Sequence, residues 1–182
     1  MPSHPLPDLW LLSDARNDAL LEDALTRLPD GSGFVFRHYH LPQDKRRVRF
    51  EMLRSICRSM NHCTILSGPA ETARRWGADG VYGAPTALDD AADMLRIATA
   101  HDEAEIAAAE RIGADAVMLS PVYATRSHPG GAALGPERFR TLAGPTCLPV
   151  IALGGMTPER ARALGISRWA AIDGLSRSPN SA

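Results

Sequence analysis

The feature that most constrains the fold is a short pattern that joins a helix to a strand and occurs three times. Residues 73–81 read ARRWGADGV, and residues 109–117, which lie 36 residues further along, read AERIGADAV. A looser third copy, ARALG at 161–165, leads into the apolar run at Trp169. In each copy a helix ends on a large apolar residue, and a glycine follows where a left-handed cap would close the helix. The pattern predicts repeated helix-then-strand units, which are typical of parallel α/β folds.

Eight short apolar runs follow one another along the chain, and most neighbours are separated by a segment with helical spacing. The runs are nearly continuous rather than alternating, as expected of parallel strands that are covered on both faces. We expect strands over 9–13, 33–39, 63–67, 80–83, 97–100, 116–122, 149–153 and 169–175. We expect helices over 18–28, 43–60, 70–76, 102–112, 136–142 and 158–164, and a shorter one over 89–96.

This alternation predicts a compact α/β fold, a (β/α)8 TIM barrel. The 182 residues allow about 23 for each unit, which is short for a fold whose usual lower size is roughly 200 residues. The tail SRSPNSA is too short and polar to form a packing helix, so we expect the last helix to be short or missing. On this interpretation residues 1–182 form a single domain. An open doubly wound sheet is the alternative, but neither a GxGxxG nor a GxxxxGK[ST] loop supports it.

Charge and composition narrow the class of partner. The 20 Lys and Arg residues nearly balance the 21 Asp and Glu residues, and only 5% of residues are aromatic, which argues against a nucleic-acid-binding protein. No apolar run approaches the roughly 20 residues of a membrane span, and MPSHPLPDLW lacks the features of a secretory signal, so we expect a cytoplasmic protein. The three cysteines lack metal-ligand spacing. Homo-oligomer formation is left open.

Polar residues collect at the ends of the apolar runs, where a parallel barrel has its active site. These strand-end residues are Asp14, Arg37, His38, His40, Ser67, Tyr82, His101, Ser120, Gly154, Gly155 and Asp173. His38 and His40 have the spacing of two metal ligands, but no third ligand is evident, and no metal site is predicted. His101 is a candidate acid, base or hydrogen-bond donor, and the alternative is a buried histidine that orients a loop. The basic run KRRVR at 45–49 is interpreted as the solvated face of a helix.

The turn GGMTP at residues 154–158 is the most specific single motif. Two glycines after a strand allow a ligand to approach the backbone closely. Thr157 is a good N-cap and Pro158 a good first helical residue, so free N–H groups would point towards the mouth of the barrel. The loops after strands 7 and 8 are the habitual phosphate site of this fold. We therefore predict an anion site here, with an ordinary capped turn as the alternative.

A long polar loop, SPVYATRSHPGG, begins at Ser120. Thr125, Arg126, Ser127 and His128 offer hydroxyl, guanidinium and imidazole donors, a set that suits phosphate or pyrophosphate oxygens. The loop is therefore predicted to bind a small phosphorylated or pyrophosphorylated substrate, and the alternative is a solvated loop that only turns the chain.

Taken together, ATAHDEAEIAAAERIGADAVMLSPVYATRSHPGG, LGPERF and LPVIALGGMTPERARALG resemble the thiamine-phosphate synthase and thiazole tautomerase (TenI-like) family. The resemblance is good over residues 97–175 and weaker over 9–83. It implies a (β/α)8 barrel that acts on thiamine precursors. The synthases of this family join an aminopyrimidine pyrophosphate to a thiazole phosphate with Mg²⁺ assistance, and the tautomerases isomerise a thiazole carboxylate phosphate without metal.

The resemblance also implies roles by position. Arg37 matches the arginine that binds pyrophosphate, and His101 matches a Ser/His segment after strand 5. The hydroxyls of Thr125 and Ser127 match those of the strand-6 loop. The pair at 154–155 matches the turn that binds the thiazole phosphate.

Several family positions differ. The strand-2 pattern QxRxK is VFRHY, the metal-binding Asn-Asp pair is Ser67-Gly68, and the segment HLGQxD is YGAPTA without its aspartate. His128 replaces the loop lysine, and Asp173, followed by Gly174, replaces the small residue that ends strand 8. Pro121 stands where the tautomerases have a histidine. The usual Mg²⁺ ligands are therefore absent.

Three hypotheses follow from these matches and differences. The first is a divergent thiamine-phosphate synthase-like transferase, in which Arg37 and the loop Thr125–His128 hold pyrophosphate and Gly154-Gly155 holds the thiazole phosphate. The second is a metal-free tautomerase-like isomerase that uses His101, His128 or Asp173. The third is a non-catalytic barrel that binds a phosphorylated ligand and has lost the metal site.

Overall fold

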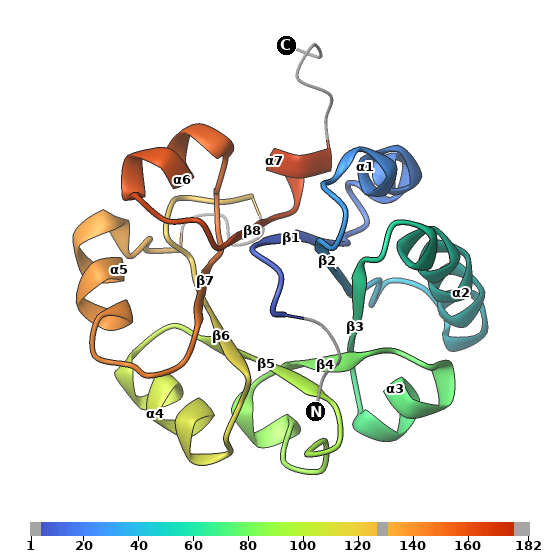
Figure 1. Ribbon diagram of the computed structural model, residues 1–182, viewed down its shortest axis with the longest axis horizontal. Helices are drawn as coiled ribbons and strands as arrows, with labels where there is room; N and C mark the ends of the chain where they lie inside the picture. The colour runs from blue at the N-terminus through green and yellow to red at the C-terminus, as the bar shows by residue number, and fades with distance from the viewer. Residues whose placement is uncertain (1–4, 127–130, 177–182) are drawn as a thin grey trace.

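The computed structural model is a closed barrel of eight parallel strands, in the order β1 to β8, with helices outside the ring (Figure 1). The structure describes residues 5–126 and 131–176. The strands are β1 (Leu9–Leu12), β2 (Gly33–Phe36), β3 (Cys63–Ser67), β4 (Gly80–Gly83), β5 (Leu95–Ala100), β6 (Ala116–Leu119), β7 (Val150–Ala152) and β8 (Trp169–Ala171). The barrel closes where Leu9, Trp10 and Leu11 of β1 pair with β8.

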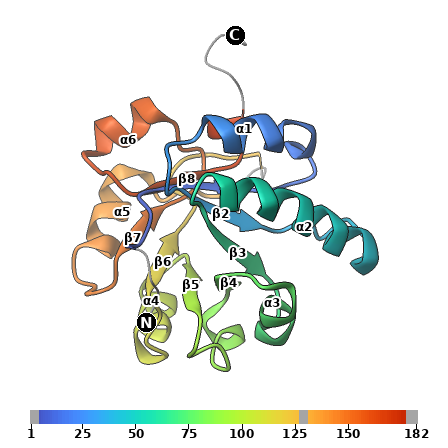
Figure 2. The same ribbon diagram turned by 45° about the vertical axis from the view of Figure 1, so that its right-hand side comes forward.

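The helices follow the strands in the order expected of βα units. They are η1 (Asp18–Leu20), α1 (Leu21–Arg27), α2 (Gln43–Ser59), α3 (Ala70–Trp76), η2 (Pro85–Ala87), α4 (Glu103–Arg111), α5 (Gly135–Ala143), α6 (Pro158–Leu164) and α7 (Asp173–Ser176). Figure 2, turned towards α2, shows α1, α2 and α3 outside strands β2 to β4. The predicted TIM barrel is confirmed, and so is the short last helix, because α7 has only four residues. None of the described helices is long and apolar enough to cross a membrane.

Several sequence expectations about individual elements are wrong. The strands expected over 33–39 and 116–122 end earlier, at Phe36 and Leu119. Residues 173–175 were expected in the last strand but form α7, because β8 ends at Ala171. No helix forms over 89–96. The connection from β4 to β5 instead contains the single turn η2 and further turns, and β5 already begins at Leu95. Leu95 pairs with Gly80 of β4 and packs inside the barrel, so register and burial place it in a strand. The connection between β4 and β5 therefore lacks the full helix of a complete βα unit.

Glycines close three of the helix-to-strand joints as the repeated pattern predicts. Gly77 and Gly165 cap α3 and α6 with φ of +71° and +69°, and Gly113 follows α4 with φ of +64°. These are left-handed conformations that glycine adopts without a steric penalty. Each joint therefore returns the chain directly into the next strand.

Side chains fill the interior of the barrel at its N-terminal end. Trp10, Leu12, Val35 and Ile65 are fully buried in this inner cluster. Trp10 packs so closely on β2 that a Cβ at Gly33 would lie 2.2 Å from its ring, and its Nε1–H donates to the carbonyl of Pro7 over 2.8 Å. This packing fills the inside of the barrel below the C-terminal ends of the strands.

Candidate active site

The C-terminal ends of the strands surround a cavity of about 270 Å³. Its walls come from the ends of β2 and of β4 to β8 and from the loops that follow them. The lining residues are Arg37, Tyr39, Tyr82, Thr99, His101, Ser120, Pro121, Thr125, Leu153, Gly154, Gly155, Met156, Ala171, Ile172, Asp173 and Gly174. A second cavity of about 600 Å³ adjoins it, since Tyr39 and Tyr82 line both.

The main cavity brings together most of the residues that the sequence suggests for a site. The predicted residues that line it are Arg37, His101, Ser120, Thr125, Gly154, Gly155, Asp173 and Gly174. Arg126 is exposed and is not part of the lining. Ser127 and His128 lie outside the described residues. Of the other strand-end residues, Tyr82 lines the cavity, whereas Asp14, His38, His40 and Ser67 do not.

Arg37 follows the end of β2 and is anchored through its backbone. Its N–H donates to Oγ of Ser13, at the end of β1, over 2.7 Å, and its carbonyl accepts from Nε of Arg46 over 2.8 Å. Its guanidinium carbon lies 5.6 Å from the centre of the Tyr39 ring, which is the range of a cation–π contact. These contacts leave a half-buried guanidinium in the cavity wall, where it can bind an anion.

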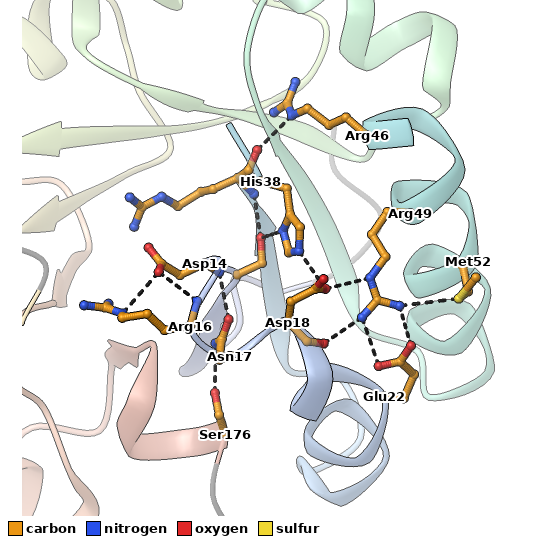
Figure 3. A network of polar contacts seen from close by, with 12 residues as sticks. Asp14, Arg16, Asn17, Asp18, Glu22, His38, Arg46, Arg49, Met52 and Ser176 are labelled. Carbon is orange, nitrogen blue, oxygen red and sulfur yellow. Dashed lines mark hydrogen bonds and ion pairs between the residues drawn. The ribbon is translucent and has the colours of Figure 1, made fainter. Parts of the chain in front are cut away.

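A network of polar contacts that includes the backbone of Arg37 joins β1, η1, β2 and α2 (Figure 3). Nδ1 of His38 lies 2.8 Å from Oγ of Ser13, and its Nε2 lies 2.8 Å from Oδ1 of Asp18. Because Oγ of Ser13 already accepts the Arg37 N–H, its own hydrogen can go to Nδ1 of a neutral His38, whose Nε2–H then donates to Asp18. Arg49 of α2 also donates to Asp18, over 2.7 Å. The network fixes the segment of backbone that carries Arg37.

The electrostatics of this network favour a neutral imidazole beside ionised carboxylates. Burial lowers the pKa of His38 below its ordinary value, despite the opposing effect of Asp18. Burial acts to raise the pKa of Asp18, but hydrogen bonds from His38 and Arg49 lower it on balance. The hydrogen bond from Arg49 also lowers the pKa of Glu22.

Arg46 of α2 ties the ends of β2 and β3 together. Besides its bond to the Arg37 carbonyl, its Nη2 donates to the carbonyl of Ser67 over 2.7 Å. Its guanidinium lies over the rings of Phe36 and Trp76, at 5.5 and 5.6 Å. Arg46 is therefore half-buried, as is Arg49, so the expectation that the basic run at 45–49 is only a solvated face is wrong for these two residues. Their acceptors come from distant parts of the sequence, which helical spacing cannot predict.

The donor set at the ends of β3 and β4 does not fit the Mg²⁺ that the resemblance implies. Mg²⁺ prefers carboxylate oxygens, whereas the described residues there are Ser67, Gly68 and the segment 83–87, which has no carboxylate. Asp89 and Asp90 are exposed on the wall of the second cavity. They do not form a ligand group with a third acidic, histidine or cysteine side chain among residues 5–126 and 131–176.

Asp18, His38 and His40 are grouped closely enough to hold a metal ion. Both ring nitrogens of His38, however, already have hydrogen-bond partners, and Asp18 is paired with Arg49. None of the three lines the main cavity. The contacts therefore explain this group as part of the network that includes the backbone of Arg37.

His101 stands at the cavity edge after β5 and is oriented by Glu105. Oε2 of Glu105 accepts the backbone N–H of His101 over 2.7 Å and lies 2.8 Å from its Nδ1. A carboxylate on Nδ1 fixes the tautomer that leaves Nε2 as a proton acceptor. His101 is half exposed, so the alternative of a buried histidine does not apply. The pair has the geometry of an oriented acid/base group.

The turn after β7 packs against the loop after β6. Gly154 and Gly155 have φ of +98° and +59°, and a Cβ on Gly154 would lie 2.6 Å from Cα of Pro121. Thr157 caps α6 by accepting the N–H of Arg160 over 3.3 Å, and Pro158 is the first helical residue, as the sequence predicts. Loop packing therefore requires glycine at both positions. The same glycines would also let a ligand approach the backbone of the turn.

Sequence reasoning missed some residues of the site. Glu105 lies four residues after His101, the spacing of contacting side chains on a helix, so a signal was present. Tyr39 is 61% exposed and lines both cavities, whereas the sequence predicts it only as the end of a strand. No local pattern indicated that Arg46 would reach the carbonyls of two strands.

Comparison with known proteins agrees with the resemblance. The family model described as thiamine monophosphate synthase matches residues 10–175. A curated relative, the thiamine-phosphate synthase of Geobacillus thermodenitrificans, is 26% identical over 187 residues, which cover 93% of this chain and 84% of the relative. The bifunctional thiamine biosynthesis protein ThiM/ThiE of Symbiobacterium thermophilum is 31% identical over 156 residues. That match covers 80% of this chain but only 32% of the bifunctional protein.

A solved structure shows the same fold. Thiamine phosphate pyrophosphorylase from Pyrococcus furiosus superposes with a TM-score of 0.78 over 94% of this chain and 88% of that chain. The sequence identity is 22%, so this match bears on the architecture alone.

Proposed function

The chain belongs to the thiamine monophosphate synthase family, and we propose that it is a transferase of thiamine biosynthesis, with residues 1–182 acting as one domain. In the proposed reaction the nitrogen of a thiazole phosphate forms a bond to the methylene carbon of an aminopyrimidine diphosphate. Pyrophosphate leaves with the electrons of the broken carbon–oxygen bond. The observation that supports this proposal is the single cavity that collects a guanidinium, hydroxyls and a glycine turn from β2, β6 and β7.

The proposed roles follow from charge. Arg37 is assigned to the leaving pyrophosphate, because a fixed cation stabilises the developing negative charge. Ser120 and Thr125 add hydroxyl donors on the opposite wall. For the loop residues Arg126, Ser127 and His128, the proposal that they bind phosphate rests on the sequence.

The thiazole phosphate is assigned to the turn at Gly154 and Gly155, where the backbone lines the cavity. Asp173 lines the same cavity, and a carboxylate near the turn would repel a phosphate. We therefore expect the phosphate to bind against the glycine turn rather than against α7.

A second candidate is a metal-free isomerase of a thiazole phosphate. The observation that favours it is the His101–Glu105 pair, because Nε2 of an imidazole fixed in this way can move a proton on a bound ring. This activity needs no metal ligand, which agrees with the donor set at the ends of β3 and β4.

The experiment that tests the transferase incubates the protein with aminopyrimidine diphosphate and thiazole phosphate, in Mg²⁺ and in EDTA. Thiamine phosphate and released pyrophosphate are measured in equal amounts if the proposal is right. Arg37→Ala should reduce both, whereas Arg47→Ala, which removes an exposed arginine paired with Glu51 on α2, should not. A protein that forms no thiamine phosphate in either condition is not a transferase. Exchange of deuterium into the thiazole would then identify the isomerase, and binding without exchange would identify a non-catalytic barrel.

A further inference from the structure

Tyr82 has an unusual position at the end of β4. Its side chain belongs to the inner cluster of the barrel, and only 9% of the residue is exposed. It lines both cavities, beside Arg37 and Tyr39, which are close enough to influence it electrostatically. A polar group is therefore buried on the wall that the two cavities share.

The Tyr82 hydroxyl has no hydrogen-bond partner within residues 5–126 and 131–176. The carbonyl of Tyr82 accepts a hydrogen bond from Oγ of Ser67 over 3.3 Å, but this bond does not involve the phenol. Tyr39 shows the contrast, because its hydroxyl is bonded to Oγ of Ser67. A phenol on a cavity wall to which none of the described residues hydrogen-bonds is available to a ligand.

Burial also fixes the chemical state of this phenol. It raises the pKa of Tyr82 to about 12, so the hydroxyl keeps its proton throughout the physiological range. A protonated phenol beside the Arg37 cation is a neutral hydrogen-bond donor. It is suited to an oxygen or ring nitrogen of a ligand whose charge is carried by the arginine.

We propose that Tyr82 is a specificity-determining contact, in which its hydroxyl donates a hydrogen bond to an acceptor atom of the ligand held by Arg37. The proposal rests on the proposed function in that it takes this ligand to be a phosphorylated heteroaromatic thiamine precursor. The bond selects precursors that present an acceptor at the shared wall, and it disfavours ligands that would bury a second donor there.

Tyr82→Phe tests the proposal because it removes the hydroxyl and keeps the ring. Calorimetric titration of wild type and variant uses thiazole phosphate and aminopyrimidine diphosphate as separate probes. We expect the variant to bind at least one probe about 5- to 10-fold more weakly, the effect of one neutral hydrogen bond. The melting temperature of the unliganded variant should equal or exceed that of wild type, because no internal hydrogen bond is lost.

Ser59→Ala is the control, since it also removes one hydroxyl, at the end of α2 and outside the cavity lining, and its affinities should be unchanged. Unchanged affinities in Tyr82→Phe, or a lower melting temperature without ligand, would overturn the proposal. If neither probe binds wild type, the Tyr82 contact and the proposed function both fail. Weaker binding by the variant together with no thiamine phosphate from wild type would support the contact and reject the transferase. Equal affinities of wild type and variant, together with normal synthesis of thiamine phosphate by wild type, would reject the contact and support the transferase.

Discussion

The two sides of the cavity are built in different ways. On the β6–β8 side the wall includes a glycine turn whose backbone packs closely against the preceding loop. On the β2–β4 side the wall depends on side chains, and Ser13, His38, Asp18 and Arg46 determine where Arg37 lies. The GGMTP turn of the first side matches the motif that the family resemblance implies, although Pro121 and Asp173 on the same side differ from the family. The second side differs at the ends of β3 and β4 and holds a different set of contacts. A backbone turn tolerates few changes, while a side-chain network can be replaced by another that satisfies the same neighbours.

The largest expected effect is a loss of stability when a methyl group is added to the glycine turn of the β6–β8 side. The same addition on the β2–β4 side serves as the comparison. Gly154→Ala places a Cβ 2.6 Å from Cα of Pro121 at a φ of +98°, and it should lower the free energy of unfolding by about 3 kcal/mol. Gly68→Ala, after β3, meets its first neighbour only at 3.8 Å and should change that free energy by less than about 0.5 kcal/mol. Urea denaturation measures both. Equal losses would mean that the two sides do not differ in this way.

A smaller effect is expected from the principal cation of the β2–β4 side. Arg37→Ala should weaken pyrophosphate binding by on the order of 2 kcal/mol, because a charge-assisted hydrogen bond is lost. The stability of the protein should change little, since Ser13 and Arg46 contact only the backbone of this residue. Calorimetry with inorganic pyrophosphate measures the affinity, and Arg47→Ala is the control. An unchanged affinity would place the anion site elsewhere.

The same contrast explains how much of the molecule could be predicted. The barrel, the joints at Gly77, Gly113 and Gly165, and the capped turn at Thr157 follow from local patterns, because each is a property of neighbouring residues. The helix expected at 89–96 failed because pairing of Leu95 with β4, a tertiary contact, outweighed helical spacing.

In the site, too, local features could be predicted and contacts between distant residues could not. The strand ends could be located from the sequence, because the fold brings them to one edge. The partners of His38 and Arg46 could not, because Asp18 and Ser67 lie about 20 residues away in sequence and meet them where neighbouring βα units pack together. The contacts that orient Arg37 therefore required the structure.

Between the two sides, the His101–Glu105 pair after β5 allows the proposed acid/base role to be tested. Glu105→Gln keeps the shape of the side chain but removes the charge that orients Nδ1 of His101, so turnover should fall about 5-fold with little change in KM. Glu103→Gln is the control, because that carboxylate faces Arg138 at 3.8 Å and not His101. Steady-state kinetics across pH should show a changed profile for the first variant only. Identical profiles would assign Glu105 to helix capping alone.

The smallest expected effect is the pH dependence of the side-chain network. Burial lowers the pKa of His38, so near its ordinary value of 6.5 the folded protein binds fewer protons than the unfolded chain. Lowering the pH from 7 to 5 should therefore reduce the free energy of unfolding, by less than the effect of Gly154→Ala. Asp18 and Glu22, whose pKa values are lowered, add a further loss only below their ordinary values of 3.8 and 4.5.

His38→Asn separates this contribution from the rest, because asparagine tolerates the φ of +43° at this position and does not titrate. The variant should be less stable than wild type at pH 7, and the difference should shrink as the pH falls to 5. Urea denaturation at each pH measures it. A constant difference would show that His38 is not kept neutral by burial, and the β2–β4 side would then be no more sensitive to protonation than the glycine turn opposite.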